Sequence, residues 1–156
     1  MNGSSQLSRA HWLALLVPAA LLGGAYISEL GFGLFPCEMC WWQRWPHFAA
    51  LALAMVAFVA PPKWLWTALA AGGILTSGLL GGYHAGVEYD WWEGITSCAS
   101  GPVAMSVDQL ESFVTPCDEA AFRFLTISLA GWNFIISTLA AITIFVLLAK
   151  RDRSAA

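Results

Sequence analysis

The stretch 41-WWQRWPHFAALALAMVAFVAPPKWLWTALAAGGILTSGLLGGY-83 decides the fold class, because it contains two long apolar runs divided by a short break. Residues 46–60 include no Asp, Glu, Lys or Arg. The pair Pro61-Pro62 ends the first run, since proline lacks the N–H that a helix interior needs. Runs of about 20 apolar residues are long enough to cross a bilayer. We therefore predict an antiparallel pair of membrane-spanning helices, at about 41–60 and 64–83.

Two further apolar runs, at about 12–35 and 124–149, flank this pair. The chain of 156 residues is 58% hydrophobic and 11% charged, whereas a soluble domain carries about 25% charged residues. Backbone groups in lipid must bond internally, so each run is predicted to be helical. The first run is longer than a signal-peptide core, and we expect it to remain uncleaved. The prediction is an all-α membrane protein, with four transmembrane helices in one domain over 1–156.

The basic residues orient this bundle in the membrane. Four helices put both termini and the 61–63 connection on one side of the bilayer. That side would hold five of the seven basic residues, and the opposite side would hold only Arg44 and Arg123. The positive-inside rule then predicts cytoplasmic termini. For a bacterium this means the inner membrane, with loops at about 36–40 and 84–123 in the periplasm. No basic patch indicates a nucleic-acid partner.

All four cysteines fall in these two outer loops. Cys37 and Cys40 occupy the first, and Cys98 and Cys117 the second. The bacterial periplasm is oxidising, so disulfides persist there, and four cysteines allow three pairings. Closing a four-residue ring stabilises a fold by about 2 kcal/mol at most, before strain is subtracted. Two cysteines three apart therefore indicate reversible redox chemistry better than a structural cross-link.

The surroundings of Cys40 favour a reactive thiolate. Pro36 ends the first span, and the second helix is predicted to begin near Cys40. Helix N-termini carry free N–H groups and partial positive charge, which stabilise a thiolate. Arg44 lies one turn further along the same face. A membrane arginine often marks function, although its side chain can also reach to the lipid headgroups. The cysteine one turn away favours the functional interpretation.

Metal binding is the alternative use of these cysteines. Zinc sites combine paired CxxC motifs, or one CxxC motif with spaced histidines. The second cysteine pair is separated by nineteen positions, and the histidines are scattered at 11, 47 and 84. A c-type haem site requires His after the second cysteine, where this chain has Trp41. The predicted site contains no metal.

The string 36-PCEMCWWQR-44 resembles the P-C-x-x-C-x-x-Q-R signature of the disulfide bond formation protein B (DsbB) family. The resemblance covers nearly the whole chain. It includes 83-YHAGVEYDWWEG-94, which leads into Cys98, and 116-PCDEAAFRFLTISLAGWN-133, which enters the last helix. One departure is Thr126, where we expect a glycine that would ease close helix contact.

The resemblance implies a quinone-dependent protein-disulfide oxidoreductase. Such an enzyme reoxidises a periplasmic thioredoxin-like thiol oxidase (DsbA) and passes the electrons to a membrane quinone, either ubiquinone or menaquinone. It implies that a Cys98–Cys117 disulfide meets the partner, with Cys98 forming the mixed disulfide. Cys117 would then attack Cys37, and Cys40 would be left as a thiolate facing the quinone.

The same resemblance suggests the residues that bind the quinone. Arg44 should hold the quinone and stabilise its developing negative charge. His84, at the outer end of the third helix, is the second candidate, and its alternative is an ordinary interfacial histidine. Arg123 could favour a thiolate at Cys117 or anchor the loop at the headgroups. Gln43 is expected only to pack, and Glu88 has no role that we can derive.

Two other function classes compete with this prediction. One is a vitamin K epoxide reductase-like enzyme, which also couples a membrane CxxC pair to quinone chemistry. The other is a non-enzymatic membrane protein that binds metal. In the second loop, residues 106–113 have the apolar spacing of a short amphipathic helix on the membrane surface, or of ordinary packing against the bundle.

Overall fold

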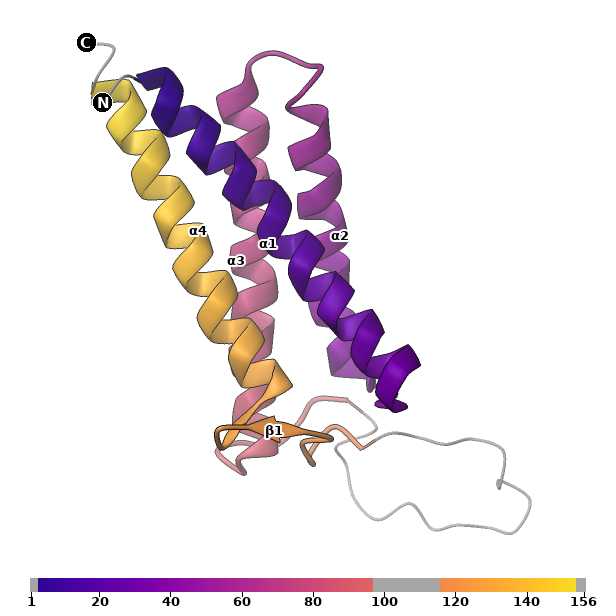
Figure 1. The fold of residues 1–156 in the computed structure, drawn as a ribbon. Helices are drawn as coiled ribbons and strands as arrows, with labels where there is room; N and C mark the ends of the chain where they lie inside the picture. Colours follow the sequence, from indigo (N-terminus) through magenta and orange to yellow (C-terminus); the bar gives the residue numbers. More distant parts are fainter. Residues whose placement is uncertain (1–2, 97–115, 154–156) are drawn as a thin grey trace, which may run out of the picture.

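Four long helices form an elongated bundle in the computed structural model, which describes residues 3–96 and 116–153 (Figure 1). Both chain ends and the connection between the second and third helices lie at the same end of the bundle. A two-stranded hairpin lies at the opposite end. The elements in chain order are α1 Gly3–Phe32, α2 Glu38–Val56, α3 Lys63–Glu88, β1 Arg123–Phe124, β2 Ile127–Ser128 and α4 Leu129–Arg153.

The outer surfaces of the helices identify a membrane protein. Among the described residues, three helices are long and apolar enough to cross a bilayer: α1, α3 and α4. Large apolar side chains on α1 and α4 remain exposed, including Leu16 and Leu139 at 56% and 61%. The first turns of α2 instead carry Gln43, Arg44 and His47, all buried inside the bundle. A fourth span through α2 therefore stays a prediction.

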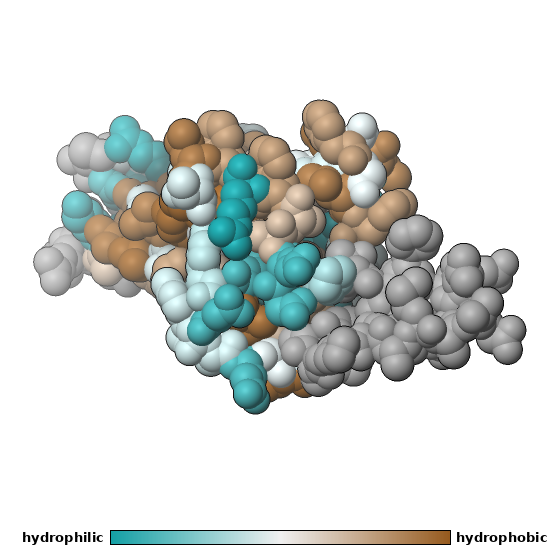
Figure 2. Space-filling model, turned by 90° about the horizontal axis from the view of Figure 1, so that it is seen from below, coloured by the Kyte–Doolittle hydropathy of each residue, from teal (hydrophilic) through white to brown (hydrophobic). Residues whose placement is uncertain are grey.

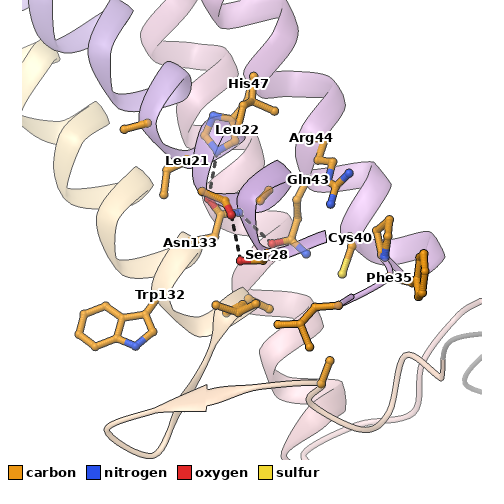
Figure 3. A pocket seen from close by; sticks show the side chains of 18 residues that line it. Leu21, Leu22, Ser28, Phe35, Cys40, Gln43, Arg44, His47, Trp132 and Asn133 are labelled. Atoms are coloured by element: carbon orange, nitrogen blue, oxygen red, sulfur yellow. Dashed lines mark hydrogen bonds between the residues drawn. The ribbon is translucent and has the colours of Figure 1, made fainter. Parts of the chain in front are cut away.

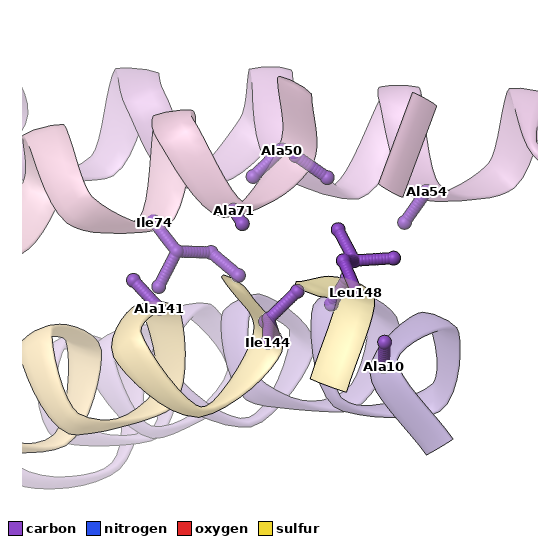
Figure 4. Packing of buried hydrophobic residues seen from close by; sticks show 10 residues of the cluster. Ala10, Ala50, Ala54, Ala71, Ile74, Ala141, Ile144 and Leu148 are labelled. Carbon is purple, nitrogen blue, oxygen red and sulfur yellow. The ribbon is translucent and has the colours of Figure 1, made fainter. Parts of the chain in front are cut away.

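Small side chains build the core of the bundle. Alanines from all four helices meet a few larger residues, among them Ile74 and Ile144, where α2 and α3 face α1 and α4 (Figure 4). Small residues let helix backbones approach closely, which is how helices gain contact in lipid. His11 of α1 lies 2.8 Å from the carbonyl oxygen of Ala54 in the last turn of α2. Its Nε2 proton satisfies a carbonyl that the helix end leaves free.

Gly81 marks a close approach of α3 to α4 near the hairpin end. A Cβ at this position would lie 2.9 Å from the carbonyl oxygen of Ala130 and 3.0 Å from Asn133 Nδ2. Gly81→Ala should therefore lower the free energy of unfolding by about 1–3 kcal/mol, because two helices must move apart. Gly72→Ala is the matched control in the same helix, since its Cβ meets nothing within 4 Å. Thermal unfolding in detergent tests the pair, and equal midpoints would contradict this packing.

The entry to the last helix differs from the sequence prediction. Residues 123–128 form the β1–β2 hairpin, with Arg123 paired to Ser128, and α4 begins at Leu129 instead of Phe124. The two turn residues, Leu125 and Thr126, both have positive φ values, of 50° and 68°. A two-residue hairpin turn with this backbone favours Asn-Gly. A glycine at position 126 would thus suit the turn conformation. Close helix contact is therefore not the reason to expect a glycine there.

Thr126→Gly is expected to stabilise the protein. A left-handed conformation costs a non-glycine residue roughly 1–2 kcal/mol, and glycine avoids most of this cost. The gain in free energy of unfolding should be about 1 kcal/mol, measured by thermal unfolding in detergent. Thr143→Gly in the helical part of α4 is the control and should lower stability. A loss of stability with Thr126→Gly would show that the turn does not strain this residue.

Candidate redox site

The first turn of α2 places two sulfur atoms side by side. Cys37 is the N-cap of the helix, and its Sγ accepts a hydrogen bond from the backbone N–H of Cys40 at 3.3 Å. The two Sγ atoms lie 3.1 Å apart, with the Cys37 thiol donating to Cys40. The helix begins at Glu38, two residues earlier than predicted. Both sulfurs therefore lie within the positive field of the helix N-terminus.

The surroundings shift the pKa values of the two thiols in opposite directions. The hydrogen bond from Cys37, helped by nearby His84, lowers the pKa of Cys40 despite burial. The same hydrogen bond, with burial and the neighbouring charge of Cys40, raises the pKa of Cys37. Both cysteines lie before Trp41, where the predicted membrane-spanning run begins. In the reduced pair, Cys40 therefore carries the negative charge and Cys37 holds the proton.

This asymmetry predicts the order of alkylation. In the reduced protein at neutral pH, Cys40 should react with iodoacetamide more than about tenfold faster than Cys37, because the thiolate is the nucleophile. Cys37→Ala removes the hydrogen bond, so the pH profile of Cys40 alkylation should move to higher pH. Mass spectrometry of each modified peptide measures both effects. Faster reaction at Cys37, or an unmoved profile, would contradict the assignment.

His84 lies inside the last two turns of α3, directly behind the sulfur pair. Its Nε2 is 3.6 Å from Cys37 Sγ and 3.2 Å from the carbonyl oxygen of Cys117. Its Nδ1 is 2.9 Å from Gln43 Nε2, which also donates to the Met39 carbonyl. The carbonyl fixes the amide nitrogen of Gln43 in place, so Nδ1 must accept. The ring proton of His84 therefore lies on Nε2, facing the sulfur site.

Cys117 packs on the same side of the pair as His84. It is fully buried in a cluster with Cys37, Met39 and Val87. The structure thus brings three of the four predicted cysteines together. Cys98 lies outside the described residues, as does the 106–113 segment. The Cys98–Cys117 pairing therefore remains a prediction.

A cavity of about 280 Å³ opens on the other side of the pair, between α1, α2 and α4. Most of its wall is apolar. Its polar lining includes Cys40, Gln43, Arg44 and His47 from α2 and Asn133 from α4 (Figure 3). Neither Cys37 nor His84 belongs to the lining. The surroundings of the two sulfurs therefore differ in one respect: both lie at the cluster that contains Cys117, but only Cys40 also borders the cavity.

Arg44 is held in the cavity wall by three side chains. Its Nη1 is 2.7 Å from Glu29 Oε2 of α1. Its guanidinium carbon lies 5.0 Å from the ring centre of Tyr26 and 4.9 Å from that of Trp41. The ion pair and the aromatic faces fix the cation beside Cys40. Glu29 was missed in the sequence, although it is the only charged residue of the first predicted span.

A second missed feature is a chain of hydrogen bonds that runs into the bundle. Asn133 Nδ2 donates to Gln43 Oε1 at 2.8 Å and to the Ser77 carbonyl at 3.1 Å. Asn133 Oδ1 lies 3.0 Å from His47 Nε2. Gln43, expected only to pack, thus connects His84 at the sulfurs with Asn133 at the cavity. Polar residues spaced along several helices were the only sign of this network in the sequence.

The charged residues beyond the sulfur pair tie the hairpin to α3. Arg123 donates to the backbone carbonyl of Glu88 at 3.3 Å and lies over the ring of Tyr89. The Glu88 carboxylate is buried 3.7 Å from His84 Nε2. Hydrophilic side chains gather across this end of the molecule, with hydrophobic ones around them (Figure 2).

The same sulfur pair has the donor set of a metal site. Cys37, Cys40 and His84 each offer one ligand atom, and these atoms lie within 4.8 Å of one another. His84 is remote from the two cysteines in the sequence but adjacent to them in space. Two sulfurs and one imidazole suit a soft ion such as Zn²⁺, although a structural zinc site has four ligands.

Comparisons with known proteins give the family. Residues 8–147 match the family described as "Disulfide bond formation protein DsbB". A "Disulfide bond formation protein B 2" of Pseudomonas syringae pv. syringae is 30% identical, over 91% of this chain and 93% of its own. A "Disulfide bond formation protein B" of Aromatoleum aromaticum is 29% identical, over 92% and 94%. No solved structure matches. The chain therefore belongs to the DsbB family of disulfide bond formation proteins, and it is a membrane oxidoreductase.

Proposed function

We propose that this protein takes electrons from a periplasmic DsbA-like thiol oxidase and passes them, through two cysteine pairs, to a membrane quinone. One observation carries the proposal: the two sulfurs at the start of α2 have different neighbours. Both lie at the cluster that contains Cys117, the cysteine of the second loop, but only Cys40 also borders an apolar cavity beside a fixed arginine. A pair that accepts electrons on one side and delivers them on the other needs this arrangement.

The first step is exchange with the partner. A thiolate of the reduced oxidase attacks Cys98 in the Cys98–Cys117 disulfide, which forms a mixed disulfide and releases Cys117 as a thiolate. The second thiol of the oxidase then resolves the mixed disulfide. The oxidase leaves with its disulfide restored, and its two electrons remain in Cys98 and Cys117.

The second step transfers the electrons to the first pair. Cys117 attacks Cys37 Sγ, which breaks the Cys37–Cys40 bond and releases Cys40. The helix N-terminus and the nearby His84 stabilise Cys40 as the leaving thiolate. Cys98 then attacks the Cys37–Cys117 bond, and the Cys98–Cys117 disulfide forms again. Cys37 and Cys40 now hold both electrons.

The residues of the cavity fit a quinone. An apolar wall suits the ring and its lipid tail, and the Arg44 cation suits an oxygen that gains negative charge. When bound, the quinone supplies a two-electron acceptor. His84 remains a predicted quinone ligand, but its contacts with Cys37 and Cys117 favour a role at the sulfurs. The chemistry of these side chains does not distinguish ubiquinone from menaquinone.

The proposal includes the topology. The chain would be a single integral domain over 1–156 in a bacterial inner membrane, with α2 as the fourth span and both termini cytoplasmic. The basic residues near the termini support this orientation through the positive-inside rule. The cysteines would then face the periplasm, where the thiol oxidase is found. A membrane-impermeant maleimide applied to intact spheroplasts after reduction should label Cys98, in the loop proposed to face the periplasm.

A reconstituted assay tests the function. Purified protein is mixed with a reduced DsbA-like oxidase and a short-chain quinone, and quinone absorbance is followed. Turnover should require both the oxidase and the quinone. Oxidation of the partner without quinone reduction would overturn the proposed electron acceptor.

Metal binding is the second candidate, because Cys37, Cys40 and His84 converge on one point. It predicts stoichiometric zinc in the purified reduced protein and no quinone reduction. Quinone turnover in metal-free protein would exclude it as the principal function. A vitamin K epoxide reductase-like activity would instead require reduction of the epoxide.

A further inference from the structure

His47 lines the cavity at the end away from the sulfurs. It follows Cys40 and Arg44 at spacings of seven and three residues, so the three side chains lie on one face of α2. Figure 3 shows Cys40 and His47 at opposite ends of this row, with Gln43 and Arg44 between them. His47 is only 3% exposed. A titratable side chain thus lies in the apolar wall, and the proposed mechanism leaves it without a role.

The surrounding hydrogen bonds fix the tautomer of His47. Asn133 Nδ2 donates to the Ser77 carbonyl and to Gln43 Oε1, so its amide nitrogen cannot exchange places with Oδ1. Oδ1 also accepts from Ser137 Oγ at 2.8 Å. His47 Nε2, 3.0 Å from Oδ1, must therefore donate. In the neutral ring this leaves Nδ1 as an unprotonated acceptor.

His47 Nδ1 has no hydrogen-bond partner within the described part of the chain, and the atom is buried. Buried polar atoms in proteins are nearly always paired, because an unpaired one loses its bond to water. His47 as a residue lines a ligand-sized cavity, and its acceptor lacks a partner, which together point to a bound molecule that supplies the donor. A quinol hydroxyl is such a donor, and a protonated His47 could in turn donate to a quinone carbonyl.

We propose that His47 binds the quinone oxygen at the end of the cavity away from Cys40 and carries the proton for that oxygen. This inference rests on the proposed function. The Cys37 thiol and the Cys40 thiolate lose two electrons and one proton as their disulfide forms, whereas a quinone that becomes a quinol gains two electrons and two protons. Each quinone oxygen needs one proton. His47 takes a proton from the medium at Nδ1 and gives it to one oxygen, while the Cys37 thiol supplies the proton for the other. Hydrogen bonds through Asn133 and Gln43 link His47 to His84 behind the sulfurs.

Two substitutions separate binding from proton transfer. His47→Gln places an amide nitrogen near the Nε2 position, so it keeps the bond to Asn133 and loses the Nδ1 acceptor. His47→Asn keeps an acceptor near the Nδ1 position and cannot titrate. The matched control is His11→Gln, which changes another buried histidine at the far end of the bundle.

The first measurement is quinol binding, read from quenching of tryptophan fluorescence by a short-chain quinol. His47→Gln should weaken quinol binding about tenfold, the scale for one lost hydrogen bond, while His47→Asn and His11→Gln retain most of the affinity. The second measurement is turnover against pH. Both His47 variants should lose about 100-fold in kcat and lose the wild-type pH dependence. Thiol exchange with the partner oxidase should not change.

The outcomes separate this inference from the function on which it rests. One outcome is that His47→Gln reduces quinone with wild-type quinol affinity and a wild-type pH profile. That result would overturn the role of His47 and leave the proposed function intact. Absence of quinone reduction by the wild-type protein would overturn both. If His47→Gln does not fold, the kcat and pH profile of His47→Asn test the inference. Asparagine cannot titrate, so wild-type values in this variant would overturn the role of His47.

Discussion

Cys40→Ser is expected to lower quinone-coupled turnover by at least about 1,000-fold, the scale for loss of a nucleophile. A serine hydroxyl cannot form the disulfide that receives electrons from the second pair. The sulfur at 40 is also the one that borders the cavity. One round of exchange should survive, because the Cys98–Cys117 pair remains intact. Each variant molecule should therefore oxidise one partner molecule and then stop.

The measurement for Cys40→Ser is partner oxidation followed with quinone in excess, compared with Met39→Leu. Met39 is buried in the same helical turn, and leucine nearly conserves its volume. Met39→Leu should turn over continuously at close to the wild-type rate. Sustained quinone reduction by Cys40→Ser would remove this sulfur from the electron path.

Arg44→Met is expected to raise the KM for quinone about 100-fold and to lower stability. The lost cation accounts for the first effect, since a fixed charge beside a developing oxyanion contributes several kcal/mol. The second effect arises because Glu29, whose side chain is only 20% exposed, keeps a carboxylate without its partner. Removing one member of a buried ion pair costs about 3 kcal/mol.

The double variant Arg44→Met/Glu29→Gln separates the two effects. Replacing the carboxylate by an amide removes the unpaired charge, so the free energy of unfolding should recover most of its loss. Quinone use should stay impaired, because the cation is still absent. Thermal unfolding and steady-state kinetics on the single and double variants measure both quantities. Recovery of the wild-type KM in the double variant would show that Arg44 serves only to neutralise Glu29.

Run lengths and local spacing were sufficient to predict the four helices and the placement of Cys40 and Arg44 beside each other. Four apolar runs gave four helices, and the spacing of Cys40 and Arg44 placed both on one face of α2. These features depend on neighbours along one helix, so the sequence contains them. The cysteine spacing already indicated redox chemistry, and the family signature added the quinone and the partner oxidase.

The features that the sequence could not specify depend on contacts between helices or on backbone conformation. Glu29 reaches Arg44 from α1, and His84 reaches the sulfurs from α3, through packing that no local pattern specifies. The helix at 124–149 starts late because Leu125 and Thr126 adopt positive φ values, which neither residue type favours. His47 was counted among scattered histidines, and only the three-dimensional arrangement places it in the cavity.

The most direct test uses a variant with serine at positions 98 and 117, so that Cys37 and Cys40 are the only thiols. The fully reduced variant is mixed anaerobically with one equivalent of a short-chain quinone. Quinol is measured by absorbance, and the Cys37–Cys40 disulfide by mass spectrometry. We expect one quinol for each disulfide formed. Thiols that stay reduced beside unchanged quinone, or a disulfide that forms without an equal amount of quinol, would contradict electron transfer from this pair to the quinone.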